Sequence, residues 1–163
     1  MSTETHINFI SLHPRSSWLR AVFASDEATG SETQVRVPNR VLVIEDDLLV
    51  AAQIETTLTE AGFDVIGVAP TGEEAIELAA EEPPDLAVVD IRLAGDKDGV
   101  DTALELFRSH GTRCIFASAH SDHEGRRRAA HAAPLGWLQK PYSMASLTQM
   151  VSAAVSELRS QRD

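Results

Sequence analysis

From Val41 onward, short apolar runs alternate with longer amphipathic stretches. The apolar runs have the length of β-strands and are largely continuous, which is typical of strands that are covered on both faces. The stretches between them repeat their apolar residues with helical spacing. The predicted strands are residues 41–44, 64–69, 86–89, 114–117 and 137–139.

The predicted helices end at residues that terminate helices. Gly62 and Gly111 end the first and third helices, because glycine readily adopts the left-handed backbone that follows a helix. Pro83 ends the second, since proline cannot continue one. The residues predicted to face the core are Val50, Ile54, Leu58 and Ala61 in the first helix, Val100, Ala103, Leu104 and Phe107 in the third, and Leu147, Met150, Val151, Ala154, Val155 and Leu158 in the last.

Helix starts are predicted from capping residues. Thr71 with Glu74 forms a capping box at the second helix, and Ser121 with Glu124 forms another at the fourth. Asp47 is expected to cap the first helix. These local signals place a helix after each of the strands that they follow.

Five strands alternating with five helices indicate an α/β fold with an open, doubly wound parallel sheet. In such a sheet, functional residues gather at the carboxyl ends of the strands. We expect this domain over residues 39–160, after an N-terminal extension of residues 1–38 whose weak pattern fits a short helix and a flexible tail equally well. The last helix ends near Leu158, so we expect no output domain to follow it.

Composition and charge narrow the possible functions. The formal net charge of -11 disfavours direct binding of nucleic acid, because a phosphate backbone would be repelled. No apolar run approaches the ~20 residues of a membrane helix, and no secretory signal is recognisable, so we expect a cytoplasmic protein. The single cysteine, Cys114, lies in an apolar run and is expected to pack in the core.

Polar side chains follow four of the predicted strands: Glu45 and Asp46 the first, Asp90 the third, Ser118 the fourth and Lys140 the fifth. Carboxylates gathered at one sheet edge repel one another unless a cation lies among them. Oxygen ligands without a thiolate, in a site open to phosphate, favour Mg²⁺ over Ca²⁺. A carboxylate beside a metal ion, an ammonium and a hydroxyl is suited to accepting a phosphoryl group.

These strand ends resemble the signature positions of the CheY-like receiver family of two-component response regulators. The matching segments are residues 41–47 (Val-Leu-Val-Ile-Glu-Asp-Asp), residues 85–90 (Asp-Leu-Ala-Val-Val-Asp), Ser118-Ala119 and Lys140-Pro141. The resemblance covers roughly residues 39–160. It implies a (βα)5 flavodoxin-like sheet with strand order 2-1-3-4-5 and Mg²⁺ as cofactor.

The resemblance also implies a role for each site residue. Asp90 would be the phospho-acceptor and a metal ligand. Asp46 would ligate Mg²⁺ directly and Glu45 through a water, with the backbone carbonyl of Arg92 as a further ligand. Lys140 would pair with the phosphate.

Three further positions carry implied roles. Ser118 would bind a phosphoryl oxygen after transfer, and Trp137 stands where the family has its aromatic switch residue. A cis peptide before Pro141 would aim the preceding lysine inward. Two features depart from the family: residues 91–99 form a loop one residue longer than usual and without its proline, and the switch residue is the bulkier tryptophan.

Other polar residues receive structural interpretations. Asp96 and Asp98 are expected to belong to a turn. Residues 126–128, Arg-Arg-Arg, form a solvated helix face or, alternatively, a docking patch for an acidic partner. His120, His123 and His131 are expected at the surface, since a zinc site would require further ligands.

The resemblance implies phosphorelay signalling. A sensor histidine kinase or phosphotransfer protein would phosphorylate Asp90, and the domain would catalyse its own phosphorylation and dephosphorylation without being an enzyme for another substrate. The output would be binding to an unknown downstream protein, or homodimerisation through the fourth helix, the strand of residues 137–139 and the last helix. The alternatives are a phosphorylation-independent interaction module and a phosphate-ester hydrolase, which Arg92 and Leu93 disfavour because neither is a general acid.

Overall fold

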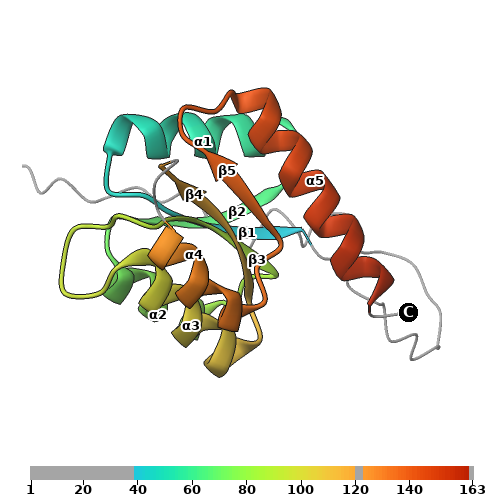
Figure 1. Ribbon diagram of the computed structural model, residues 1–163. Helices are drawn as coiled ribbons and strands as arrows, with labels where there is room; N and C mark the ends of the chain where they lie inside the picture. Colours follow the sequence, from blue (N-terminus) through green and yellow to red (C-terminus); the bar gives the residue numbers. More distant parts are fainter. Residues whose placement is uncertain (1–38, 120–122, 162–163) are drawn as a thin grey trace, which may run out of the picture. The chain divides into compact units, whose positions relative to one another are not determined.

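The computed structural model describes residues 39–119 and 123–161. In this part of the chain, five parallel strands form one sheet in the order β2-β1-β3-β4-β5, with an α-helix after each strand (Figure 1). This topology confirms the predicted fold class and strand order. The strands are β1 Arg40–Ile44, β2 Asp64–Ala69, β3 Leu86–Asp90, β4 Arg113–Ser118 and β5 Gly136–Gln139. The helices are α1 Leu48–Glu60, α2 Gly72–Glu81, α3 Gly99–His110, α4 His123–Ala129 and α5 Met144–Ser160.

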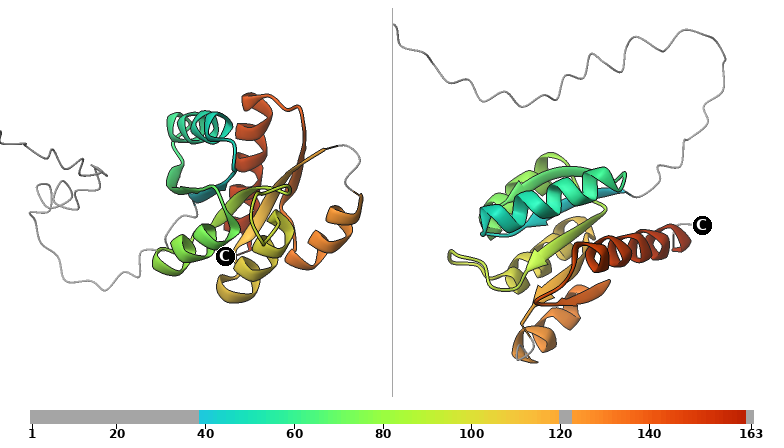
Figure 2. Two further views of the ribbon diagram at one scale, coloured as in Figure 1. Left: turned by 90° about the vertical axis from the view of Figure 1, so that its left-hand side faces the viewer. Right: turned by 90° about the horizontal axis from the view of Figure 1, so that it is seen from above.

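Helices cover both faces of the sheet, α1 and α5 on one side and α2, α3 and α4 on the other (Figures 1 and 2). Consecutive residues of β1 point to opposite faces: Val41 and Val43 pack with α1 and α5, whereas Leu42 and Ile44 pack with the other three helices. All four are fully buried. A strand buried on both faces must be apolar at every position, which explains the continuous runs in the sequence.

The predicted core faces agree with the structure except at particular positions. Ile54 and Leu58 of α1 are buried, but Ala61 is exposed at the C-cap, and the buried alanine is Ala51. The helix ends at Glu60, so a residue that continues the stripe no longer faces the sheet. In α3 the pattern missed Leu106, which is 1% exposed. In α5 the predicted stripe is buried except for the half-buried Met150.

Capping residues act as predicted wherever the structure describes them. The Asp47 side chain accepts hydrogen bonds from the amides of Leu49 and Val50, 2.9 and 3.2 Å long, and Thr71 Oγ1 accepts one from the Glu74 amide, 3.2 Å long. The capping box of the fourth helix includes a residue within 120–122, which lies outside the described residues, as does the extension of residues 1–38. Gly62 and Gly111 adopt positive φ angles of 89° and 69° at the ends of their helices.

The structure also shows what surrounds the remaining polar residues. Cys114 is buried in the core, and burial raises the pKa of its thiol to about 12, which confirms the packing role. His123 and His131 are exposed, as predicted, and His120 lies outside the described residues. The prediction of a solvated arginine face holds only for Arg127, because Arg128 forms ion pairs with α3 and Arg126 lies over an aromatic ring.

Candidate functional site

Three carboxylates meet where β1 and β3 end. These strands are neighbours in parallel register, with Ile44 opposite Val89, so the residues that follow them leave the sheet at the same edge. One oxygen each of Glu45, Asp46 and Asp90 lies within 4.8 Å of the others. Glu45 and Asp90 are buried, whereas Asp46 is exposed, so the group opens toward solvent on one side. Hard cations such as Mg²⁺ prefer this set of oxygen donors.

Lys140 lies against the same carboxylates. Its Nζ is 2.6 Å from Asp90 Oδ2 and 3.5 Å from Glu45 Oε2. Its backbone amide donates to the Ser118 carbonyl oxygen, 2.8 Å away, and its peptide bond to Pro141 is cis. Burial alone would lower the pKa of Lys140, but the hydrogen bond and charge of Asp90, with the charge of Glu45, raise it above its usual value. The ammonium is therefore protonated at neutral pH.

The electrostatics of this edge favour an added cation. Burial, followed by the nearby charge of Asp90, raises the pKa of Glu45, although the Asp47 amide and Lys140 partly offset this effect. Lys140 pairs with Asp90 and Glu45, and the charge of one ammonium only partly compensates the repulsion among three carboxylates. A divalent ion held by these oxygens would remove the remainder, and the residues present therefore fit Mg²⁺.

The loop after β3 closes on the acceptor carboxylate. The Arg92 amide donates to Asp90 Oδ1 over 3.0 Å, and the Gly99 amide donates to the Ile91 carbonyl oxygen over 2.9 Å. A Cβ on Gly99 would lie 1.9 Å from the carbonyl oxygen of Asp90, so only glycine fits this close approach. Asp98 begins α3 as its N-cap, a more specific role than the predicted turn.

Ser118 and Trp137 lie on the neighbouring strands β4 and β5 and have different surroundings. Ser118 is 2% exposed at the end of β4, and its Oγ forms no hydrogen bond with any described residue. A buried hydroxyl without a partner is costly, so this oxygen is suited to a ligand atom. The indole of Trp137 stacks on Phe116, with ring centroids 4.9 Å apart and an interplanar angle of 22°.

Sequence reasoning missed two residues of the site. Gly99 ends the loop of residues 91–99 and packs closely against the Asp90 backbone. The Asp-Gly pair before an amphipathic helix is the sequence feature that could have indicated this. The hydroxyl of Tyr142 is buried without a hydrogen bond to any described residue, and burial raises its pKa. Tyr142 and Lys140 line a shared hollow of about 460 Å³. The one signal in the sequence for a place of Tyr142 near the site is its position two residues after Lys140.

The comparisons with known proteins agree on one family. A family model described as the response regulator receiver domain matches residues 41–152. The transcriptional regulatory protein PdtaR of Mycobacterium tuberculosis is 33% identical over 129 residues, which are 79% of this chain and 62% of that protein. The phyllosphere-induced regulator PhyR of Methylorubrum extorquens is 32% identical over 133 residues, covering 80% of this chain and 48% of that protein. The chain thus spans less than two thirds of these relatives.

Solved structures give the same result. The signal receiver domain of a modulated diguanylate cyclase from Desulfovibrio desulfuricans G20 has a TM-score of 0.70 and 36% identity, covering 76% of this chain and 98% of that one. A CheY-like receiver domain protein from Methanospirillum hungatei JF-1 has a TM-score of 0.69 at 21% identity and shows the fold alone. With the acidic cluster at the sheet edge and the family model over residues 41–152, the chain belongs to the response regulator receiver domain family.

Proposed function

We propose that the domain accepts a phosphoryl group on Asp90 from a sensor histidine kinase or phosphotransfer protein. The observation that carries this proposal is the 2.6 Å contact between Lys140 Nζ and Asp90 Oδ2, within a cluster of three carboxylates. Mg²⁺ would be held by Glu45, Asp46 and Asp90, with the backbone carbonyl of Arg92 as a further ligand. When bound, it would offset the charge on the oxygens of the transferring group.

The side chains divide the work of transfer. A carboxylate oxygen of Asp90 attacks phosphorus as the bond from phosphorus to the donor's histidine nitrogen breaks, which leaves an acyl phosphate and a free imidazole. Lys140 balances the charge of the new phosphate, and the Ser118 hydroxyl donates to one of its oxygens. Water later attacks phosphorus, which releases inorganic phosphate and restores the Asp90 carboxylate, so the domain also reverses its own modification.

Intact-mass measurement after incubation with acetyl phosphate and Mg²⁺ tests this function. A gain of one phosphoryl group that depends on Mg²⁺ is expected. No gain would favour the alternative of a phosphorylation-independent interaction module. Multiple turnover on a generic phosphate ester would favour a hydrolase.

Asp46→Asn is expected to weaken Mg²⁺ binding by at least about tenfold. In other metal sites, even the loss of a residue that only hydrogen-bonds a ligand lowers metal affinity by roughly 10–100-fold. Titration calorimetry with MgCl2 measures this change. Asp47→Asn is the matched control, since Asp47 caps α1 and asparagine caps equally well. Equal affinity in the two variants would exclude Asp46 as a ligand.

Ser118→Ala is expected to separate stability from phosphoryl binding. Its hydroxyl forms no hydrogen bond with a described residue. The free energy of unfolding of the unphosphorylated variant should therefore lie within about 1 kcal/mol of that of the parent. Binding of beryllofluoride with Mg²⁺ should weaken about tenfold or more, since a hydrogen bond to a charged group contributes about 1.5–3 kcal/mol. Thr112→Ala should lose stability but bind beryllofluoride as the parent does, because the buried Thr112 hydroxyl donates to the Pro84 carbonyl oxygen. If Ser118→Ala binds beryllofluoride as tightly as the parent, Ser118 does not bind a phosphoryl oxygen.

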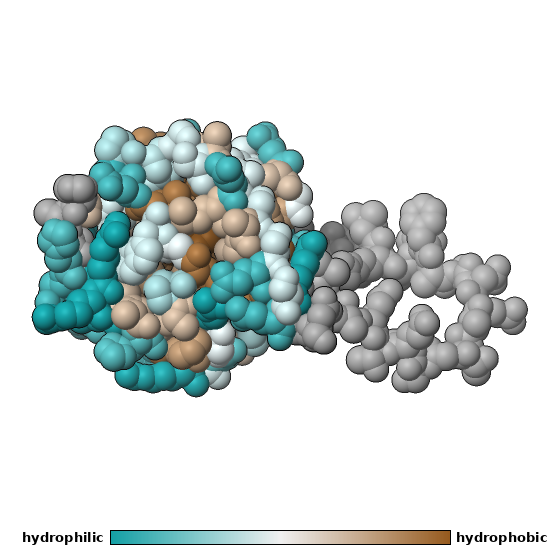
Figure 3. Space-filling model, turned by 45° about the vertical axis from the view of Figure 1, so that its right-hand side comes forward, coloured by the Kyte–Doolittle hydropathy of each residue, from teal (hydrophilic) through white to brown (hydrophobic). Residues whose placement is uncertain are grey.

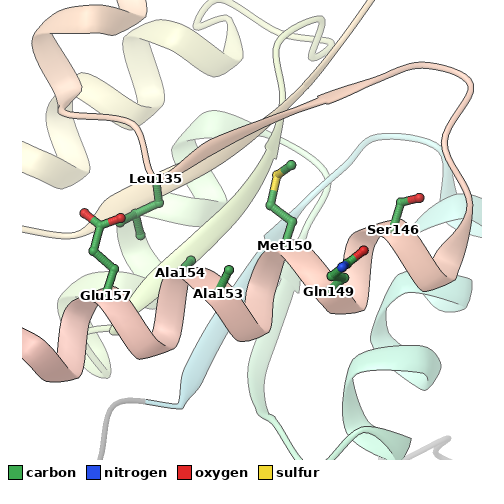
Figure 4. Close-up of a pocket in the computed structure, with 7 residues that line it drawn as sticks. All are labelled: Leu135, Ser146, Gln149, Met150, Ala153, Ala154 and Glu157. Atoms are coloured by element: carbon green, nitrogen blue, oxygen red, sulfur yellow. The ribbon is translucent and has the colours of Figure 1, made fainter.

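We further propose that the output is protein binding, including homodimerisation, at the surface formed by α4, β5 and α5. A hollow of about 370 Å³ lies between Leu135 and α5, with Met150 and Ala154 on its apolar side and Glu157 at one end (Figure 4). The space-filling view shows a largely hydrophilic face with apolar side chains gathered toward its centre (Figure 3).

Within residues 39–119 and 123–161, no helix is both long and apolar enough to cross a bilayer.

A further inference from the structure

Helix α4 contributes little apolar surface to the core. It runs only from His123 to Ala129, and its buried residues are Gly125 and Ala129. By contrast, α5 buries five residues, among them Leu147, Val151 and Leu158. Apolar burial is the main force that holds a helix to a sheet. Something other than apolar burial must therefore contribute to the attachment of α4.

Arg128 joins α4 to the start of α3. Its Nη1 lies 2.7 Å from Asp98 Oδ2, and its Nη2 lies 3.3 Å from Asp98 Oδ1 and 2.6 Å from Asp101 Oδ1. A guanidinium that binds two carboxylates with both nitrogens is a strong, directional contact. Burial alone would raise the pKa of Asp98, but hydrogen bonds from Arg128 and the Asp101 amide lower it. Both partners are therefore charged at neutral pH.

Arg126 joins α4 to the aromatic stack. Its guanidinium carbon lies 4.8 Å from the ring centroid of Trp137, which in turn stacks on Phe116 of β4. A cation over an indole face is attracted by the ring electrons. Its buried Nε forms no hydrogen bond within the described part of the chain, so this contact is less complete than that of Arg128.

Arg127, between the two, forms its ion pair within its own helix. Its side chain is 79% exposed and pairs with Glu124, three residues earlier in α4. Such exposed pairs contribute little to stability. Three consecutive arginines thus have three different surroundings, and Arg127 is a matched control for its neighbours.

We propose that α4 is a latch held closed by Arg128 on α3 and by Arg126 on Trp137, which opens while the rest of the domain stays folded. The attachment points matter for the site. Asp98 directly precedes Gly99, which contacts the Asp90 backbone, and Trp137 lies on β5, which ends at Gln139 immediately before Lys140. The latch belongs to the unmodified domain, so it goes beyond the proposed phosphorylation and does not depend on it.

Hydrogen–deuterium exchange of the full, unphosphorylated chain tests the latch. In Arg128→Ala, amides of residues 127–133 should exchange about tenfold faster or more, and in Arg126→Ala they should exchange faster by a smaller factor. Arg127→Ala should match the parent, and α5 should keep its protection in all variants. About 1 M salt should accelerate exchange of α4 in the parent more than in Arg128→Ala, because salt screens the ion pairs.

Three outcomes would overturn the proposal. Equal exchange of α4 in Arg128→Ala and Arg127→Ala would show that the ion pairs do not hold the helix. Equal acceleration of α4 and α5 would show that α4 does not open separately. If Arg128→Ala does not fold, Asp101→Ala removes one of the two carboxylates that bind Arg128 and leaves the Asp98 cap intact. Faster exchange confined to α4 is then expected, and unchanged exchange would refute the latch.

Discussion

Asp90→Asn is expected to abolish Mg²⁺-dependent phosphoryl uptake and to leave the fold intact. Asparagine has the same size, but its amide is far less nucleophilic than a carboxylate and carries no charge to pair with Lys140, 2.6 Å away. Intact-mass analysis after incubation with acetyl phosphate should show a gain of one phosphoryl group in the parent and none in the variant. Far-ultraviolet circular dichroism should give the same spectrum for both.

Asp96→Asn provides the matched control for this variant. Asp96 is an exposed aspartate of the same loop, so its replacement changes charge equally without touching the carboxylate cluster. Its phosphoryl uptake should equal that of the parent. Labelling that persists in Asp90→Asn would place the acceptor at another residue and refute the proposed function.

Gly99→Ala is expected to destabilise the domain and to displace the acceptor. The new Cβ would lie 1.9 Å from the Asp90 carbonyl oxygen, 2.8 Å from its carbonyl carbon and 2.9 Å from Ile91 Cα. These are backbone atoms that cannot rotate away, so the strand end must shift. Overpacking of this kind costs about 1–3 kcal/mol or more, measurable as a loss of unfolding free energy in urea. Phosphoryl uptake should slow as well, because the Asp90 carboxylate moves relative to Lys140.

Gly136→Ala is the comparison for this prediction. A Cβ there would meet Met150 Sδ at 2.7 Å, but a thioether side chain can adopt another rotamer. Its loss of stability should therefore be smaller, and its phosphoryl uptake unchanged. Helix propensity alone predicts the opposite for Gly99, since alanine is favoured over glycine by about 1 kcal/mol. A Gly99→Ala variant more stable than the parent would thus contradict the close approach.

Most of the fold follows from local sequence patterns. The predicted strand of residues 64–69 and the capping box at Thr71 depend only on neighbouring residues, and the structure has both where they were predicted. Continuous apolar strands between amphipathic helices leave few topologies, because crossover connections are right-handed. The sequence pattern could not tell that Leu58 is the last buried residue of α1, so Ala61 was assigned to the core.

Charged residues show where sequence reasoning ends. Three consecutive arginines look alike in sequence, yet Arg126 lies on Trp137, Arg127 is exposed, and Arg128 binds the start of α3. Long side chains can reach several partners, and the packing of neighbouring elements selects among them. The same holds for Tyr142, whose burial depends on what covers it.

The sequence by itself determined the order of strands and helices and the residues at each strand's carboxyl end, since periodicity and capping are local properties and parallel strands end at one edge. Only the tertiary structure decided how these residues meet. Lys140 comes within 2.6 Å of Asp90, 50 residues away in sequence, and Gly99 closes on the Asp90 backbone. Such contacts depend on the register of neighbouring strands and on how closely helices pack against them, which are properties of the assembled core and not of any single segment.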